Sequence, residues 1–175
     1  MKFLAISGSA RRASTNTALL RALQAAAGAA HTVSVYDRVG ELPVFSPDLE
    51  LYPPLAVSAL AKAIADADGL ILASPEYIRS IPGGLKNAID WLVSRNEVIG
   101  KPIVLAHASH RGDDMLAQLR VVLATLSERF NEELFLRIPL MKLSPEEIVE
   151  RLSALRHQEE MRGFLDAFAR YCGSA

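Results

Sequence analysis

Short apolar runs alternate with helix-like segments along this 175-residue chain, and that alternation restricts the fold more than any other feature. The apolar runs, which we interpret as β-strands, are 2–7, 32–37, 69–74, 102–109 and 133–140. The helical segments are 15–29, 54–67, 82–95, 113–127 and 144–171, the last with a break expected near Gly163. Strands that alternate with helices form a parallel sheet with helices on both faces. Several runs are almost wholly apolar, which is typical of strands buried on both faces.

We therefore predict an α/β fold in which five parallel strands form the middle layer of a three-layer sandwich. The length of the chain suits the flavodoxin-like strand order 2-1-3-4-5 and a single domain over residues 1–175. In such sheets ligands bind at the carboxyl ends of the strands, where the winding direction reverses. The loops after strands one, three and four are therefore the places to look for a site. The irregular stretch 38–53 is long for a loop without structure, so we expect it to have a function.

Charge and cysteine content narrow the possible partners and locations. The formal net charge is -1, so no basic field favours nucleic acid or an anionic membrane. One cysteine, Cys172, allows no disulfide within the chain, which is typical of a reducing compartment. The sequence has neither a signal-peptide pattern nor an uncharged apolar stretch long enough to span a bilayer. We expect a cytoplasmic protein.

The first loop has the composition of an anion site. After Gly8 it carries hydroxyl, amide and arginine side chains, namely Ser9, Arg11, Arg12, Ser14, Thr15 and Asn16. A helix that begins here offers unpaired N–H groups to an anion, and an arginine can pair with a phosphate. The glycine patterns of dinucleotide and nucleoside-triphosphate loops are absent, so a terminal phosphomonoester fits better. The alternative is that Ser14 or Thr15 only caps the helix and the arginines are solvated.

The second loop, which follows strand three, places apolar groups at the mouth of the sheet. Tyr77 and Ile78 could contact a flat ring there, whereas Glu76 could be only a solvated charge. Pro75 ends the strand, and we expect Ser80 to cap a helix that has Pro82 in its first turn. The stripe of apolar residues on this helix indicates core or interface packing, as does Trp91 beside it. The stripe consists of Leu85, Ala88, Ile89 and Leu92.

The third loop, 107–114, contains two histidines and two aspartates, which raises the possibility of a metal site. His107 should still belong to the strand, and His110 with Asp113 or Asp114 has no ligand partner at a recognised spacing. We therefore expect no metal. A hydrolase is equally poorly supported, because the loops contain no G-x-S-x-G turn.

Several stretches resemble the NAD(P)H-dependent FMN reductase family. GSARRASTN (8–16) resembles its phosphate loop, GSxRxxSxN, and LPVFSPDLE (42–50) resembles the segment before its second helix. ADGLILASPEYIRSIPGGLKNAIDWLVSR (67–95) is similar, nearly residue for residue, to the signature PEYN-x-S-x-PGxLKNAIDW. GKP (100–102) also matches, and the resemblance covers about residues 1–127. Two departures are visible: Ile78 replaces the asparagine that follows the tyrosine, and the third loop has only one glycine, Gly112.

The resemblance implies a flavodoxin-like enzyme that binds FMN and takes a hydride from NADPH or NADH. It then passes electrons to a small-molecule acceptor such as free flavin, a quinone, an azo dye or a metal oxyanion. It also implies a homodimer or homotetramer in which the helix 82–95 helps to form the subunit contact. The residues it assigns to FMN are Ser9, Arg11, Ser14, Thr15 and Asn16 at the phosphate, Pro75, Glu76, Tyr77 and Ile78 at the ring, and Ser109, His110 and Gly112 in the third loop.

No catalytic side chain is expected, because hydride moves directly between nicotinamide and flavin and the cofactor carries the chemistry. Two alternatives remain: an FMN-binding electron carrier without a substrate of its own, and a flavodoxin-like protein that acts through partner contacts. Carriers are commonly strongly acidic, whereas this chain is near neutral. Arg79 and Arg111 lie near the expected mouth and could meet the 2′-phosphate of NADPH, although solvated arginines are more common.

Overall fold

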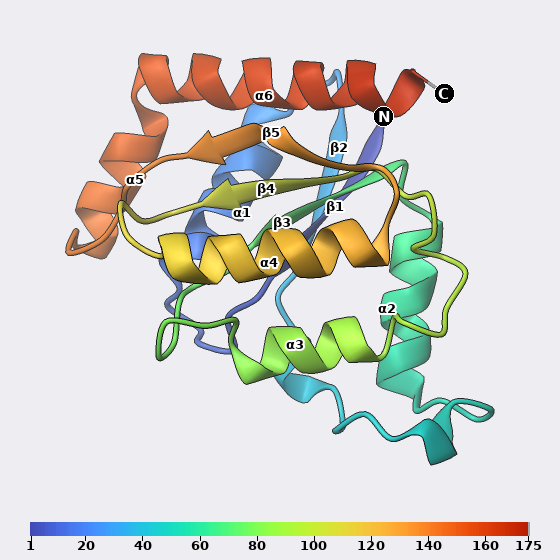
Figure 1. Cartoon of the computed structure of the whole chain (residues 1–175). Coiled ribbons are helices and arrows are strands. Elements are labelled where there is room, and N and C mark those ends of the chain that lie inside the picture. Colours follow the sequence, from blue (N-terminus) through green and yellow to red (C-terminus); the bar gives the residue numbers. More distant parts are fainter. Residues whose placement is uncertain (175) are drawn as a thin grey trace.

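The computed structural model describes residues 1–174 and contains a five-stranded sheet in the order β2-β1-β3-β4-β5 (Figure 1). Every neighbouring pair of strands is parallel. The strands are β1 (Lys2–Ser7), β2 (Thr32–Tyr36), β3 (Gly69–Ala73), β4 (Ile103–His107) and β5 (Phe130–Arg137). The strand order predicted from the sequence is therefore confirmed, and the reversal of winding lies between β1 and β3.

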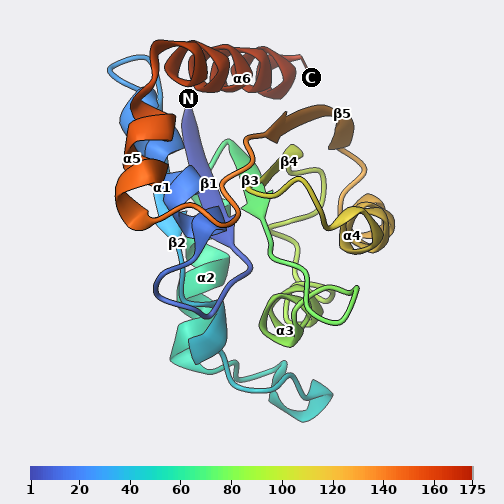
Figure 2. The ribbon, with the colours of Figure 1, turned by 90° about the vertical axis from the view of Figure 1, so that its left-hand side faces the viewer.

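Helices cover both faces of this sheet, as the turned view shows (Figure 2). One face carries α1 (Thr15–Ala26), α5 (Pro145–Ser153) and α6 (Leu155–Gly173). The other carries α2 (Leu55–Ala65), α3 (Gly83–Asp90) and α4 (Asp113–Leu126). Two short 3-10 helices, η1 (Val39–Glu41) and η2 (Pro47–Leu49), lie within the stretch 38–53. Among residues 1–174, no helix has both the length and the apolar composition that crossing a bilayer requires.

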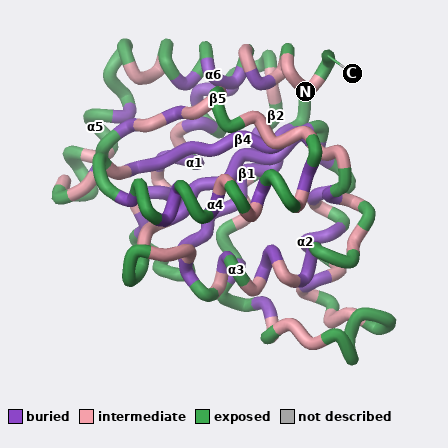
Figure 3. Tube along the Cα trace, in the orientation of Figure 1, coloured by how far each residue is buried: buried purple, intermediate pink, exposed green. Residues whose placement is uncertain are grey.

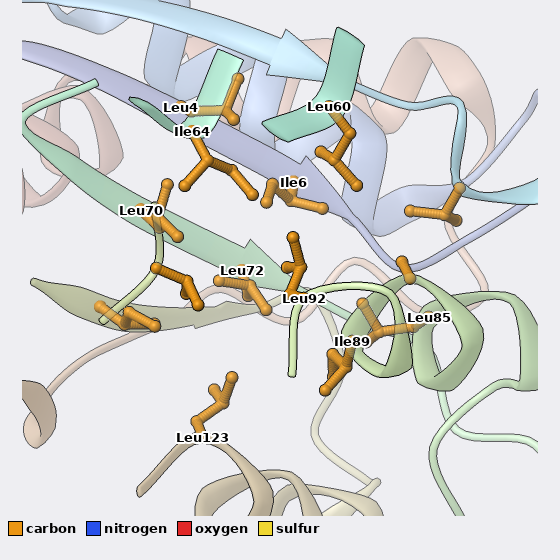
Figure 4. Packing of buried hydrophobic residues seen from close by; sticks show 14 of the residues in the cluster. Leu4, Ile6, Leu60, Ile64, Leu70, Leu72, Leu85, Ile89, Leu92 and Leu123 are labelled. Carbon is orange, nitrogen blue, oxygen red and sulfur yellow. The ribbon is translucent and has the colours of Figure 1, made fainter. Parts of the chain in front are cut away.

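The central strands are the most deeply buried part of the chain (Figure 3). All residues of β3 and β4 are buried, and successive side chains enter opposite core layers. Figure 4 shows Leu4, Ile6, Leu70 and Leu72 facing the helices on the α2–α4 side. The apolar stripe of α3 packs into this layer, so its interpretation as core is confirmed. Burying each such side chain contributes about 1.5–3 kcal/mol relative to exposure.

The helix after the second loop is shorter than predicted. Ser80 does not cap it; instead α3 begins at Gly83, directly after Pro82, and ends at Asp90. A residue that precedes a proline is disfavoured in helical conformation, so the helix cannot include Ile81. The Ser80 hydroxyl instead bonds to the side-chain oxygen of Gln118 at 2.7 Å.

Trp91 is buried within the chain, with 2% of its surface exposed. Its indole N–H donates to the carbonyl of Pro43 at 2.7 Å, and the ring of Phe45 packs against it edge-on at 5.1 Å. Asn87 adds hydrogen bonds to the backbone of the same segment, from the Phe45 N–H at 2.8 Å and to the Pro43 carbonyl at 2.9 Å. These contacts fix the start of the projecting segment 42–55 onto α3. Trp91 is therefore part of the core and presents no surface to a second subunit.

The edge strand and the C-terminal helices also differ from the prediction. β5 begins three residues earlier than expected because a strand at the edge of a sheet tolerates polar, exposed residues such as Glu132 and Glu133. The capping box of α5 forms as its sequence predicts, between Ser144 and Glu147. The helical break is at Ala154, whose ψ of 136° is extended, and not near Gly163.

α6 runs through Gly163 because its apolar face is held by packing. Met161, Phe164, Leu165 and Phe168 are all buried against the sheet side of the core. The free energy of this burial outweighs the cost of about 1 kcal/mol for a glycine inside a helix.

Gly163→Ala should therefore stabilise the protein by about 0.5–1 kcal/mol, because a Cβ at this position meets no atom within 4 Å. Thermal denaturation should show a melting temperature raised by roughly 1–4 °C. Gly69→Ala is the matched control, since its Cβ would lie 2.5 Å from Cζ of the buried Phe168 ring and should lower the melting temperature. A Gly163→Ala protein that melts below wild type would contradict a continuous α6.

Candidate functional site

The loops that follow β1, β3 and β4 meet at one end of the sheet, at the left in Figure 1. The Gly8 N–H extends the ladder to β3 by donating to the Ala73 carbonyl at 2.7 Å. A Cβ on Gly8 would lie 2.7 Å from Leu85 of α3, so only glycine allows this close approach. Asn16, buried at the start of α1, accepts a hydrogen bond at 3.0 Å from the Ala108 N–H of the third loop. The three loops thus form one connected unit.

Hydroxyl groups of the first loop shape its backbone. Ser14 caps α1, with its oxygen accepting from the Thr17 N–H at 3.4 Å, as the helix-capping interpretation predicts. The buried Ser9 hydroxyl accepts from the Arg11 N–H at 3.1 Å. Ser7 and Thr17 exchange a hydrogen bond of 2.7 Å beneath them. This supporting pair was not predicted from the sequence.

The N-terminus of α1 is open to an anion. Helix geometry leaves the N–H groups of Thr15 and Asn16 without an intrahelical acceptor, and no acidic residue lies in the first turn. Arg11 and Arg12 are exposed, and neither forms an ion pair with any residue in 1–174. Together these groups give the loop a field that favours negative charge.

A pocket of about 520 Å³ lies beside this loop, on the side of β2. It is lined by residues of the first loop, of α1 and of the segment after β2, namely Ala10, Arg11, Arg12, Thr17, Arg21, Asp37, Arg38, Gly40 and Glu41. Arg21 pairs with Asp37 at 2.8 Å and Arg38 with Glu41 at 2.7 Å. The cations of the pocket that stay unpaired among the described residues are therefore those of the loop itself.

The second loop folds into a tight hairpin in which Tyr77 and Ser80 pair through both backbone hydrogen bonds. Ile78 and Arg79 at its tip have positive φ angles of 51° and 57°. Arg79 is held by an ion pair to Asp114 at 2.6 Å, and its hydrogen bond to that carboxylate raises the pKa of the guanidinium. The Tyr77 side chain is half exposed at the mouth of the sheet, whereas Ile78 is fully exposed.

Two side chains at the ends of β4 and β5 hold the backbone of the third loop. His107 is buried at the end of β4, as predicted, and its Nε2–H donates to the Arg111 carbonyl at 2.6 Å. Burial lowers the pKa of this imidazole. Arg137, at the end of β5, donates to the Ser109 carbonyl at 2.7 Å and to the Arg111 carbonyl at 3.1 Å.

Close packing also fixes Gly112 in this loop. Its φ is 99°, and a Cβ there would lie 2.9 Å from the ring nitrogen of His107. The same added atom would be 3.6 Å from the Glu76 carboxylate, so the second and third loops approach each other here. Only glycine fits this position without displacing the imidazole.

Asp113 and Asp114 serve as ion-pair partners, Asp113 to Arg137 at 2.9 Å and Asp114 to Arg79. In the part of the chain that the structure describes, no group of three or more His, Cys, Asp or Glu side chains is placed to hold a metal. Arg137 was missed by sequence analysis, although a lone cation near the end of the apolar run 133–140 is a signal that could have found it. Gln118, which bonds to Ser80 and to the Arg79 carbonyl, gave no such signal.

Comparison with known proteins agrees with this geometry. The sequence model of the NADPH-dependent FMN reductase family matches residues 1–130 of this chain. Quinone reductase from Escherichia coli (strain K12) is 35% identical over 113 residues, which cover 62% of this chain and 60% of that protein. The 2-hydroxy-1,4-benzoquinone reductase of Burkholderia sp is 43% identical over 91 residues, which cover 52% of this chain and 49% of that protein. The chain thus spans about half to three fifths of the length of these curated relatives.

A solved structure shares the fold over nearly its whole length. FerB, a flavoenzyme NAD(P)H:(acceptor) oxidoreductase from Paracoccus denitrificans, superposes with a TM-score of 0.77 at 26% identity. The superposition covers 98% of this chain and 97% of that chain. Since the family match includes all three loops and most of the chain, this protein belongs to the NADPH-dependent FMN reductase family.

Proposed function

We propose that this protein is an NAD(P)H-dependent FMN oxidoreductase that reduces a small-molecule acceptor such as free flavin, a quinone, an azo dye or a metal oxyanion. The observation that carries the proposal is that the open N-terminus of α1, with loop arginines that form no ion pair among residues 1–174, lies at the same end of the sheet as the half-exposed ring of Tyr77. One end of the site thus suits a phosphate and the other suits a flat ring. Membership of the family supports the same cofactor.

The residues present fit FMN. Its phosphate would be held by the first loop, through Ser9, Arg11, Ser14, Thr15 and Asn16. Asn16 can take part because its side-chain oxygen accepts from Ala108 while its amide N–H groups stay available to a ligand. Residues of the second and third loops would line the ring, namely Pro75, Glu76, Tyr77, Ile78, Ser109, His110 and Gly112. When bound, FMN supplies a ring that accepts a hydride from NAD(P)H and returns two electrons to the acceptor. The loops contribute position and electrostatics.

The electron donor would approach over the same mouth. Arg79 is committed to Asp114, whereas Arg111 is exposed and forms no ion pair among the described residues. Arg111 is therefore the better candidate to meet the 2′-phosphate of NADPH. The single cysteine supports a cytoplasmic location, where reduced nicotinamides are available.

We also infer that the protein is a homo-oligomer, and the exposed apolar residues of the projecting segment support this. Val44, Leu51, Tyr52 and Leu55 each expose more than three quarters of their surface. Val93, just after α3, is also exposed. Several large apolar residues exposed on one short segment are typical of a surface that associates with another chain. The proposed contact thus remains beside α3 but rests on this segment and not on the buried Trp91.

Purified protein should be yellow, should bleach when NADPH or NADH is added without air, and should recolour on exposure to air or a quinone. Absorbance near the flavin maximum, followed by anaerobic titration, measures this. A yellow protein that is inert to both nucleotides would favour the electron carrier. A colourless protein that FMN cannot reconstitute would favour the partner-binding alternative.

Arg11→Ala should weaken FMN binding by roughly 1.5–3 kcal/mol, the range for a hydrogen bond to a charged group. Fluorescence titration of the apoprotein should show a Kd raised roughly 10- to 150-fold. Riboflavin lacks the phosphate, so its Kd should change little. Arg12→Ala separates the two loop arginines, and Arg162→Ala on the exposed side of α6 is the remote control. An equal loss for FMN and riboflavin would show that Arg11 does not contact the phosphate.

Light scattering at micromolar concentration should give at least twice the mass of one chain. Replacing both Leu51 and Tyr52 with glutamate should reduce this to the mass of one chain, because two charges would be buried at the contact. Val121→Glu is the matched control, since Val121 is also exposed but lies on α4. The proposed contact fails if wild type is monomeric or if the double variant stays associated.

A further inference from the structure

The tip of the hairpin in the second loop combines two unfavourable features at one residue. Ile78 is 100% exposed, so its apolar side chain gains nothing from burial within the chain. Its φ of 51° lies in the left-handed region, which a β-branched side chain rarely occupies. A polar residue or glycine would fit both the exposure and the backbone better. The folding of this chain therefore does not explain the isoleucine, and we look for a contact with another molecule.

The hairpin keeps this conformation because its neighbours determine it. Tyr77 and Ser80 close the turn with hydrogen bonds of 3.2 and 3.0 Å. Gln118 of α4 binds both the Ser80 hydroxyl and the Arg79 carbonyl, at 2.7 and 2.9 Å. The ion pair between Arg79 and Asp114 adds a third link to α4. Strained residues that persist through such surrounding contacts cluster at ligand-binding sites.

The position of the tip favours a ligand of the site over a second subunit. Ile78 directly follows Tyr77, and both of these large apolar side chains are exposed on the second loop, Tyr77 by 51% and Ile78 by 100%. Figure 3 shows the hairpin as an exposed loop just before α3. The projecting segment 42–55 lies toward the other end of α3, where it forms a pocket with residues 94–97 (Figure 1). A second subunit that binds to segment 42–55 would therefore leave the hairpin accessible to a ligand of the site.

We propose that Ile78 determines acceptor specificity: it forms an apolar wall at the mouth of the site and favours acceptors with apolar rings over charged ones. This inference rests on the proposed function. The cations around the mouth, such as Arg111, draw anions in general, so discrimination in favour of an apolar ring needs an apolar contact. Ile78 offers that contact, because its whole side chain is available to be covered.

The comparison uses two acceptors that differ in apolar area. Reduction of 2-methyl-1,4-naphthoquinone takes two electrons and two protons, one hydride from NAD(P)H plus one proton from water, and yields the quinol. Ferricyanide takes one electron per ion, so two ions consume one hydride equivalent and release one proton. The measured quantity is the ratio of kcat/KM for the naphthoquinone to kcat/KM for ferricyanide.

Ile78→Asn should lower this ratio about fivefold, which corresponds to losing roughly half of the contact of a buried isoleucine. The same variant should raise the melting temperature of the apoprotein by about 2–4 °C, because asparagine tolerates the left-handed backbone. Ile78→Val is the matched control: it keeps both the branched Cβ and the apolar surface, so it should retain the wild-type ratio and melting temperature.

Four results would overturn the proposal. An Ile78→Asn protein with a raised melting temperature and an unchanged ratio would show that acceptors do not contact the tip. Equal losses with both acceptors would place the effect on the cofactor and not on the acceptor. A lowered melting temperature would show that the side chain packs within the chain. A wild type that NAD(P)H cannot bleach overturns the proposed function first, and this inference with it.

Discussion

The buried hydrogen bond between Asn16 and Ala108 is the contact on which the geometry of the site depends. It joins the start of α1 to the third loop across 92 positions of sequence, at 3.0 Å. Leaving a buried donor unpaired costs about 1–3 kcal/mol, so the two loops keep this separation. Gly8 sets the remaining distance, because the absence of a Cβ lets the first loop lie against α3. The parallel sheet brings the loops to one end, and these two residues fix their spacing.

A second set of contacts holds the loops from outside the site. His107 and Arg137 occupy the carbonyls of the third loop, while Gln118 and Asp114 hold the hairpin. In this site the cofactor would carry the chemistry, so the protein needs accurate placement more than a reactive side chain. The hydrogen bonds to the loop carbonyls and the ion pair between Arg79 and Asp114 serve this placement. A site of this kind needs no catalytic acid or base.

The strand order and the positions of the three loops could be predicted from the sequence, because hydrophobic periodicity is a local signal and parallel crossovers have one hand. The break at Ala154 could not, since nothing in the residue itself ends a helix, and Gly163 is overruled by the packing of Phe164 and Phe168. The role of Asp114 was also beyond local reasoning. Its partner, Arg79, lies 35 residues away, and only the fold brings them together.

The departure at position 78 shows how a local preference and the fold can disagree. The resemblance to the family places an asparagine here, and asparagine suits a left-handed backbone. This chain carries isoleucine in a left-handed backbone, and three links from α4 hold the hairpin in that conformation. Those links offset the strain of a β-branched residue at the tip, whose apolar side chain stays exposed to solvent. We infer that this exposed isoleucine makes its contact with another molecule, because it belongs to one of the three loops that meet at the end of the sheet where the cofactor is proposed to bind.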